Sequence, residues 1–107
     1  MIATTRIPTH RNDGSRVSKR ELQGILDRVS DAFDGYSLEG PFPGAWTASD
    51  GEVYEEESHK LEVVIARGQI KEARKVFKSI GRQLGQRAIY FDVREGGEII
   101  DLEERED

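Results

Sequence analysis

The chain has 107 residues, of which 36% are hydrophobic and 35% are charged, and its mean hydropathy is −0.66. This length supports one domain with a single modest core, and no apolar run approaches the roughly 20 residues that a membrane-spanning helix needs. The lack of cysteine excludes disulfides, thiolate metal sites and cysteine nucleophiles. The first residues lack the charged start and apolar stretch of a secretory signal, so we expect a cytoplasmic protein.

The charge is unevenly distributed along the chain. The formal net charge is −5, but residues 67–87 carry +6, which leaves −11 for the rest. An acidic total argues against a nucleic-acid partner, because neutralising phosphates requires a basic surface.

The N-terminal third predicts a strand followed by a helix. Residues 2–11 are rich in isoleucine and threonine and end at an Asn-Asp-Gly turn, and Pro8 within them favours an edge strand. Ser18 and Glu21 form a capping-box pattern, which places a helix start at Ser18. One apolar side of this helix, closed by Gly35 as a C′ residue, follows the helical period through Leu22, Ile25, Leu26, Val29 and Phe33.

Residues 36–66 predict two strands joined by a turn at Asp50-Gly51. The Gly- and Pro-rich segment 40–44 interrupts or bends the first of them. Alternation in the second strand places Leu61, Val63 and Ile65 in the core.

The C-terminal half predicts a helix over 69–84 and a strand over 88–93. Gly81 lies inside that helix, where it permits a close approach to the sheet. Gly96-Gly97 is expected to close a hairpin into a short extra strand, 98–102, ahead of an acidic end.

The resulting order, β-α-β-β-α-β plus a terminal hairpin strand, predicts one ferredoxin-like domain with both helices on one face of an antiparallel sheet. The open face is expected to pair with a second copy, giving a homodimer that can hold a small ligand between subunits. By strand phase this face holds Arg6, Pro8, His10, Glu62, Val64, Tyr90 and Asp92. The predicted ligand-binding residues are Arg6, His10, Trp46, Glu62, Tyr90 and Asp92.

The order of several short elements resembles domain-of-unknown-function family 3574, a family of small bacterial proteins. The similarity covers about residues 12 to 93, and that family has no assigned activity, so the resemblance implies an architecture and a bacterial origin. It rests on Asp13-Gly14, Val17-Ser18, Gly35-Tyr36-Ser37, Gly44, Trp46, Asp50-Gly51, Glu57-Ser58, Val63 and Gly85-Gln86. Members of the family often carry an export signal, which this chain lacks.

A basic stripe on the second helix is the main candidate for an anion site. Its residues recur at helical spacing on the side opposite the apolar one, and no aromatic residues interleave with them to stack on bases. The alternative is a solvated helix face, neutralised by the acidic tail that holds Glu98, Asp101, Glu103, Glu104, Glu106 and Asp107. The stripe consists of Lys71, Arg74, Lys75, Lys78 and Arg82.

Two further candidates concern metal binding and catalysis. Glu55, Glu57 and His59 point the same way on an extended strand and are weak candidates for a divalent metal, although a solvated strand end explains them as well. His10 and His59 are the side chains whose ordinary pKa lies near neutrality, so either could be a general base. Partners for such a base would be Ser58, Tyr36 or Tyr90.

Trp46 is expected to cap the core in preference to lining a ligand pocket. The chain contains no known catalytic, phosphate-binding or dinucleotide-binding motif, and we predict no cofactor. The sequence thus favours a small binding or interaction protein that dimerises, ahead of a small enzyme using His10 or His59 and of an anion-binding module using the basic stripe.

Overall fold

The computed structural model describes residues 1–103 as one α+β unit. A single turn of 3-10 helix, Arg67–Gln69, precedes the second α-helix. In chain order the elements are β1 (Ile2–Pro8), α1 (Lys19–Ala32), β2 (Gly35–Thr47), β3 (Val53–Val64), α2 (Ile70–Gln83) and β4 (Asp92–Arg94).

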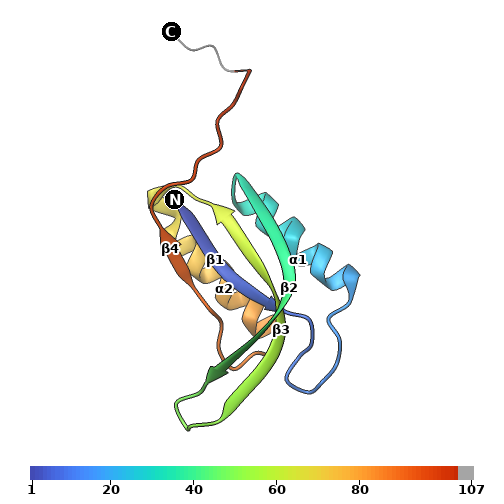
Figure 1. Ribbon diagram of the computed structural model, residues 1–107. Helices are drawn as coiled ribbons and strands as arrows, with labels where there is room; N and C mark the ends of the chain where they lie inside the picture. The colour runs from blue at the N-terminus through green and yellow to red at the C-terminus, as the bar shows by residue number, and fades with distance from the viewer. Residues whose placement is uncertain (104–107) are drawn as a thin grey trace.

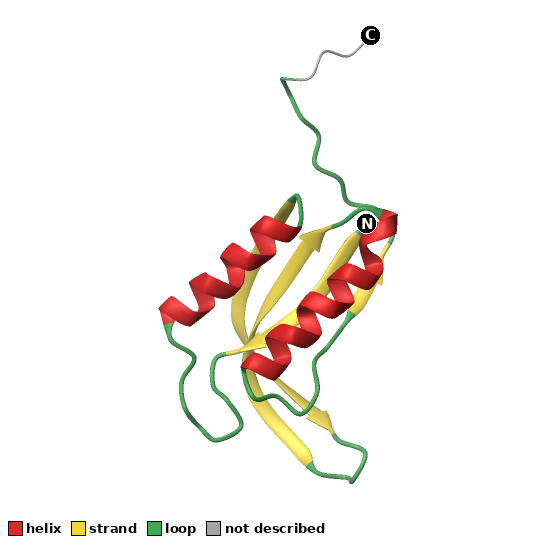
Figure 2. Cartoon of the chain, turned by 180° about the vertical axis from the view of Figure 1, so that it is seen from behind, coloured by secondary structure: helices red, strands yellow, loops and turns green. Residues whose placement is uncertain are grey.

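The strands form one antiparallel sheet in the order β2-β3-β1-β4. Both helices lie on one face of this sheet, while the other face carries none (Figures 1 and 2). This confirms the predicted ferredoxin-like arrangement, in which β3 lies between β1 and β2.

The core fills the space between the helices and the covered sheet face. Leu61 and Val63 of β3 are fully buried there, beside Ala3 and Ile7 of β1. The helices contribute one apolar side each, as their 3.6-residue period predicts. The buried helix residues are Ile25, Leu26, Val29, Ala73, Phe77, Ile80 and Gly81.

The expectation that β1 is an edge strand is wrong, because β1 lies between β3 and β4. Pro8 is tolerated in this central strand since it is the last residue of β1, where only β3 still pairs with it, through Ser58. The missing N–H therefore leaves no gap in the β1–β4 ladder.

The N-terminus of α1 agrees with the predicted cap, in part. The Ser18 hydroxyl accepts a hydrogen bond of 3.0 Å from the backbone N–H of Glu21. The Glu21 carboxylate does not return the contact and instead binds Arg11 and Gln83. At the other end, α1 ends at Ala32 with Phe33 as its C-cap, so Gly35 is the first residue of β2 and not a helix-closing residue.

The strands β2 and β3 form a long hairpin around the predicted Asp50-Gly51 turn. A register shift between Glu39 and Phe42, at the expected interruption, divides it into two halves. The outer half, residues 43–57, extends beyond the helices (Figure 1).

The C-terminal segment differs from the prediction in two ways. The last strand is short, Asp92–Arg94, and residues 88–91 lie beside the sheet without joining it. Residues 98–102 form no strand, because the chain after Gly97 crosses the end of the sheet: Gly97 lies against Ile2 and the Ile99 side chain lies against Gly35. The predicted acidic end at residues 104–107 lies outside the described residues.

None of the helices in residues 1–103 has both the length and the apolar character needed to cross a bilayer.

Candidate functional site

A pocket lies on the helix-free side of the sheet, where the outer half of the hairpin faces the segment 86–90. Its volume is about 430 Å³, within the range of small-ligand sites. We call it the hairpin pocket. It is lined by Arg6, Pro43, Gly44, Ala45, Trp46, Glu56, Ser58, Gln86, Ala88, Ile89 and Tyr90.

The hairpin supplies one wall of this pocket through strand alternation. Gly44 pairs with Glu56 and Trp46 pairs with Tyr54, so these residues share one face of the ribbon. Ser58, which is buried, continues the same face toward the sheet. Gly44 has no side chain, which leaves space between the larger residues on this wall.

Trp46 forms an aromatic pair at the outer end of the pocket. Its ring stacks on that of Tyr54, with centroids 4.9 Å apart and planes inclined by 16°. Trp46 is half-buried and lies outside the core, so the expectation that it caps the core is wrong. The outer half of the hairpin has no helix beneath it, and the ring instead packs within the hairpin.

The segment 86–90 forms the opposite wall and is fixed at several points. The Gln86 N–H donates to the Gly81 carbonyl at 2.9 Å, and the Thr5 hydroxyl donates to the Tyr90 carbonyl at 2.6 Å. Ile89 packs on Gly81, where a Cβ would lie only 3.3 Å from it. Gly81 therefore does permit a close approach to α2, but by this segment and not by a strand.

Two opposite charges line the pocket. Arg6 reaches it from β1 and makes no ion pair with another side chain in residues 1–103. Burial raises the pKa of the Glu56 carboxyl above its ordinary value, because its charged form is partly desolvated. Within residues 1–103, the site thus offers a cation and a carboxylate that each lack an ion-pair partner.

Three of the six predicted ligand-binding residues come together in this pocket, namely Arg6, Trp46 and Tyr90. Glu62 of β3 and Asp92 of the edge strand β4 lie outside the pocket on the same sheet face, where each pairs with Arg94, at 3.6 and 3.3 Å. His10 lies beyond β1 in a loop, with its Nδ1 2.9 Å from the Thr9 hydroxyl.

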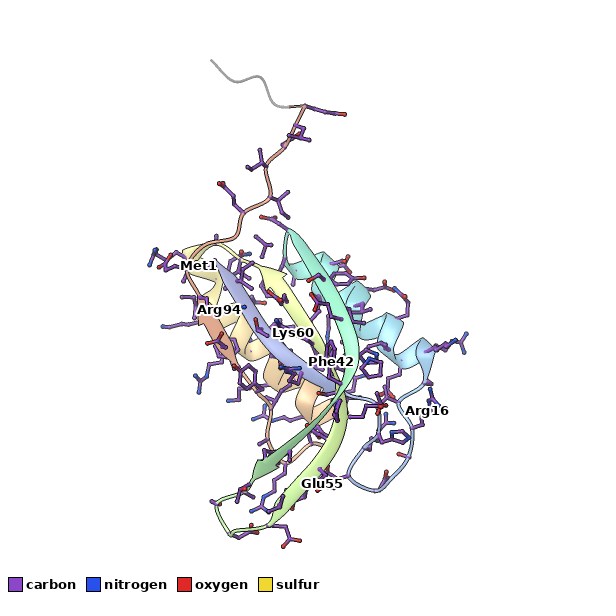
Figure 3. All side chains as sticks on the ribbon, viewed as in Figure 1. Met1, Arg16, Phe42, Glu55, Lys60 and Arg94 are labelled. Carbon is purple, nitrogen blue, oxygen red and sulfur yellow. The ribbon has the colours of Figure 1, made fainter. Side chains whose placement is uncertain are left out.

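The open sheet face is more charged than its strand phase suggested. Lys60 forms an ion pair with Glu62 at 3.0 Å, and Lys60 and Arg94 lie on the side turned away from the helices (Figure 3). Beneath this layer, Thr4 is buried and its hydroxyl has no hydrogen-bond partner in residues 1–103. Val64 is only half exposed.

The metal and histidine candidates lie elsewhere. Glu55 and Glu57 are on the hairpin face opposite Glu56, and His59 follows them on the helix-facing side, opposite Ile7. Residues 1–103 contain no group of three His, Asp or Glu side chains placed to hold a metal ion. Neither His59 nor His10 lines the hairpin pocket.

Among the suggested partners of a histidine base, Ser58 and Tyr90 line the hairpin pocket, whereas Tyr36 lies on the helix-facing side, opposite Val63.

The basic stripe is continuous on the outer side of α2, as predicted. Its five side chains surround a shallow hollow of about 180 Å³, far from the hairpin pocket in the fold. The described part of the acidic tail leaves the molecule from the end of the sheet and does not cover the stripe (Figure 2).

Sequence reasoning missed Glu56 and the segment 86–89 as parts of a binding site, and it named Ser58 only as a partner of a histidine base. For Glu56 and Ser58 the signal was the strand phase, since Gly44 and Trp46 lie on the same hairpin face as Glu56 across the turn at Asp50-Gly51. The segment carried no local signal, because its place depends on contacts with α2 and β1.

No protein-family model and no curated protein sequence matches the chain. Among solved structures, it is similar in fold to a phage SAM lyase in complex with S-methyl-5'-thioadenosine, with a TM-score of 0.53 at 10% sequence identity over 91% of this chain and 92% of that one. The apo state of a phage SAM lyase gives a TM-score of 0.51 at the same identity, covering 91% of each chain. At this identity the likeness shows a shared fold.

Proposed function

We propose that this protein binds a small sulfur-containing adenosine compound, of the class of S-adenosylmethionine (SAM) and S-methyl-5'-thioadenosine, in the hairpin pocket. The observation that carries the proposal is the combination, in one pocket of about 430 Å³, of an aromatic ring, a half-buried carboxyl and an unpaired guanidinium. The similarity in fold to a SAM lyase solved with S-methyl-5'-thioadenosine supports the choice of ligand class.

Each part of SAM has a matching group in the pocket. Trp46 offers a flat apolar surface to the adenine ring. The Glu56 carboxylate attracts the positively charged sulfonium, and its attraction is strengthened by partial burial. The Arg6 guanidinium suits the ligand's carboxylate, with which it can form two parallel hydrogen bonds.

The first test is a calorimetric titration with SAM and with S-methyl-5'-thioadenosine. Loss of a charge-assisted contact costs about 1.5–3 kcal/mol, so Arg6→Gln and Glu56→Gln should each weaken SAM binding by about 10- to 100-fold. S-methyl-5'-thioadenosine lacks both the sulfonium charge and the carboxylate, so its affinity should change by less than about threefold.

Two control variants remove the same kinds of charge, one cation and one carboxylate, at positions outside the pocket. Arg94→Gln removes a cation from the same sheet face, and Glu55→Gln removes the neighbouring carboxylate from the other hairpin face. Both should leave SAM affinity as in the wild type. Equal losses in the controls, or no binding of either compound at millimolar concentration, would contradict the proposal.

The affinity for SAM should also depend on pH. Since burial raises the pKa of Glu56, protonation begins at a higher pH than for an ordinary glutamate, and the neutral acid no longer attracts a sulfonium. SAM affinity should therefore fall as the pH drops through this pKa, while the affinity for S-methyl-5'-thioadenosine stays flat. A parallel decline for both ligands would argue that Glu56 does not face the sulfonium.

The same samples distinguish a binding protein from an enzyme. S-methyl-5'-thioadenosine is SAM without the aminocarboxypropyl group on its sulfur. Chromatography of SAM incubated with the protein therefore detects cleavage of that carbon–sulfur bond directly. We favour binding without turnover; product formation would establish the enzyme alternative. His10→Ala and His59→Ala then report whether either histidine is the general base.

We also propose that the protein is a cytoplasmic homodimer formed through the open sheet face. In its favour, that face carries both cations and anions, so a two-fold axis can place the cations of one copy against the anions of the other. Its charged residues include Arg6, Lys60, Arg94, Glu39, Glu62 and Asp92. Light scattering after size exclusion should give twice the chain mass, and Lys60→Glu should shift it to the monomer.

A further inference from the structure

The outer half of the hairpin is attached to the rest of the molecule by few polar contacts. Within residues 1–103, hydrogen bonds from residues 43–57 to the rest of the chain occur at two places. At the base, the Thr9 N–H donates to the Glu57 carbonyl at 2.9 Å, and the Thr9 hydroxyl donates to the same oxygen at 3.2 Å. Near the tip, the partner is the side chain of a single residue, Arg87.

Arg87 contacts two hairpin residues at once. Its Nη1 donates to the Asp50 carboxylate at 2.9 Å and to the Tyr54 hydroxyl at 3.1 Å. The guanidinium also lies over the Tyr54 ring, 6.0 Å from its centroid. Because Tyr54 stacks on Trp46, the contact reaches the aromatic wall of the hairpin pocket.

The hairpin turn orients the Asp50 carboxylate for its contact with Arg87. Its Oδ1 accepts the Glu52 N–H at 3.0 Å, while Oδ2 is left for Arg87. The Glu52 N–H and, after it, Arg87 lower the pKa of Asp50, so the carboxylate is charged at neutral pH. The same residue therefore forms the turn and holds the tip.

The wall that carries Arg87 is the fixed one. Gln86 bonds to Gly81 of α2 on one side of Arg87, and Tyr90 bonds to Thr5 of β1 on the other. The hairpin wall lacks such support, because no helix lies beneath its outer half (Figure 1).

We infer that Arg87 is a positioning residue that clasps the hairpin tip to the segment 86–90 and thereby sets the opening of the hairpin pocket and the orientation of Trp46. The clasp itself does not depend on the ligand, whereas its effect on binding rests on the proposed function. Arginine suits the role because its planar group presents several N–H donors, which reach a carboxylate and a phenol together.

Trp46 is the one tryptophan of the chain, so its fluorescence reports whether the Arg87 contacts hold the hairpin tip in the absence of a ligand. Arg87→Gln should shift its emission to longer wavelength and increase the acrylamide quenching constant about 1.5- to 3-fold, while far-UV circular dichroism is unchanged. Arg67→Gln is the matched control, since it breaks an exposed ion pair with Glu95 away from the pocket, and it should change neither signal.

Three further measurements keep the inference testable if Arg87→Gln does not fold. Tyr54→Phe removes one of the two hydrogen bonds and keeps the ring, so it should give a smaller change of the same sign. In the wild-type protein, 1 M salt should produce a similar shift, because exposed ion pairs are screened. Arg87→Lys should restore only part of the wild-type signal.

The outcomes separate the clasp from the proposed function. If wild-type emission and quenching persist in Arg87→Gln, Tyr54→Phe and high salt, the clasp is refuted, whatever binds. If the fluorescence changes as expected but the wild-type protein binds no S-methyl-5'-thioadenosine, the clasp stands and the proposed function fails. When both hold, Arg87→Gln should weaken binding of this compound about 3- to 10-fold.

Discussion

The inner and outer halves of the β2–β3 hairpin differ in what lies beneath them. In the inner half, Leu38 pairs with Leu61 on the face covered by the helices, and Leu61 is fully buried. In the outer half, neither face is covered by a helix, and Trp46 and Glu56 line a pocket instead. One continuous pair of strands thus contributes buried side chains to the core at one end and pocket-lining side chains at the other. The role of each half depends on whether helices cover it and not on the strand pairing.

The largest effect expected from this comparison concerns stability. Leu61→Ala leaves a cavity between the sheet and both helices and should lower the free energy of unfolding by about 2–5 kcal/mol. Val53→Ala, at an exposed position near the tip, should change it by less than about 0.5 kcal/mol. Urea unfolding followed by circular dichroism gives both values. Similar losses in the two variants would mean that the halves are not distinct.

A smaller effect is expected where α1 begins, because this helix covers the inner half only. Ser18→Ala removes the acceptor of the Glu21 N–H and should cost about 1 kcal/mol. The same urea experiment measures it, with Ser37→Ala, on an exposed part of β2, as the control. A cost below 0.3 kcal/mol would show that the remaining contacts of Glu21, with Arg11 and Gln83, hold the helix end alone.

The smallest effect concerns the half-buried Glu56 carboxyl of the outer half. The pKa of Glu56 is higher in the folded than in the unfolded chain, so folding favours the protonated form. This favourable contribution is present at low pH and is lost as the pH rises through the folded-state pKa. At pH 7, Glu56→Gln should therefore raise Tm by about 1–4 °C.

The same variant has an internal control in pH. Near pH 3.5 the wild-type side chain is itself protonated, so the difference in Tm should vanish. Differential scanning calorimetry at both pH values decides the matter, and a stabilisation that persists at low pH would assign the effect to packing.

Much of the fold was predictable from local patterns. The apolar period of α1, the Asp50-Gly51 turn and the alternation at Leu61, Val63 and Ile65 each agree with the structure, because helix and strand periods are local properties. The strand expected at 98–102 does not form, and local patterns could not show this. A β-prone segment needs a free sheet edge beside it, whereas the chain there crosses the end of the sheet.

The site was predictable only in part, for the same reason. Arg6, Trp46 and Tyr90 were named from strand phase and residue type, and the fold brings all three to one pocket. Glu56 was overlooked because it stands between two other glutamates, and only the pairing with Gly44 tells which of the three faces the pocket. Arg87 was counted only in the positive charge of residues 67–87, whereas the structure shows that its partners come from the hairpin tip.

The position of β2 at one edge of the sheet has a further consequence. An unpaired strand at a sheet border offers free N–H and C=O groups on which another chain can grow a sheet, and this is a common route to aggregation. In β2 that border is interrupted by Pro41 and Pro43, which have no N–H to donate, and by the register shift between Glu39 and Phe42. These features make the 13-residue strand β2 a poorer template for another strand than an uninterrupted edge would be.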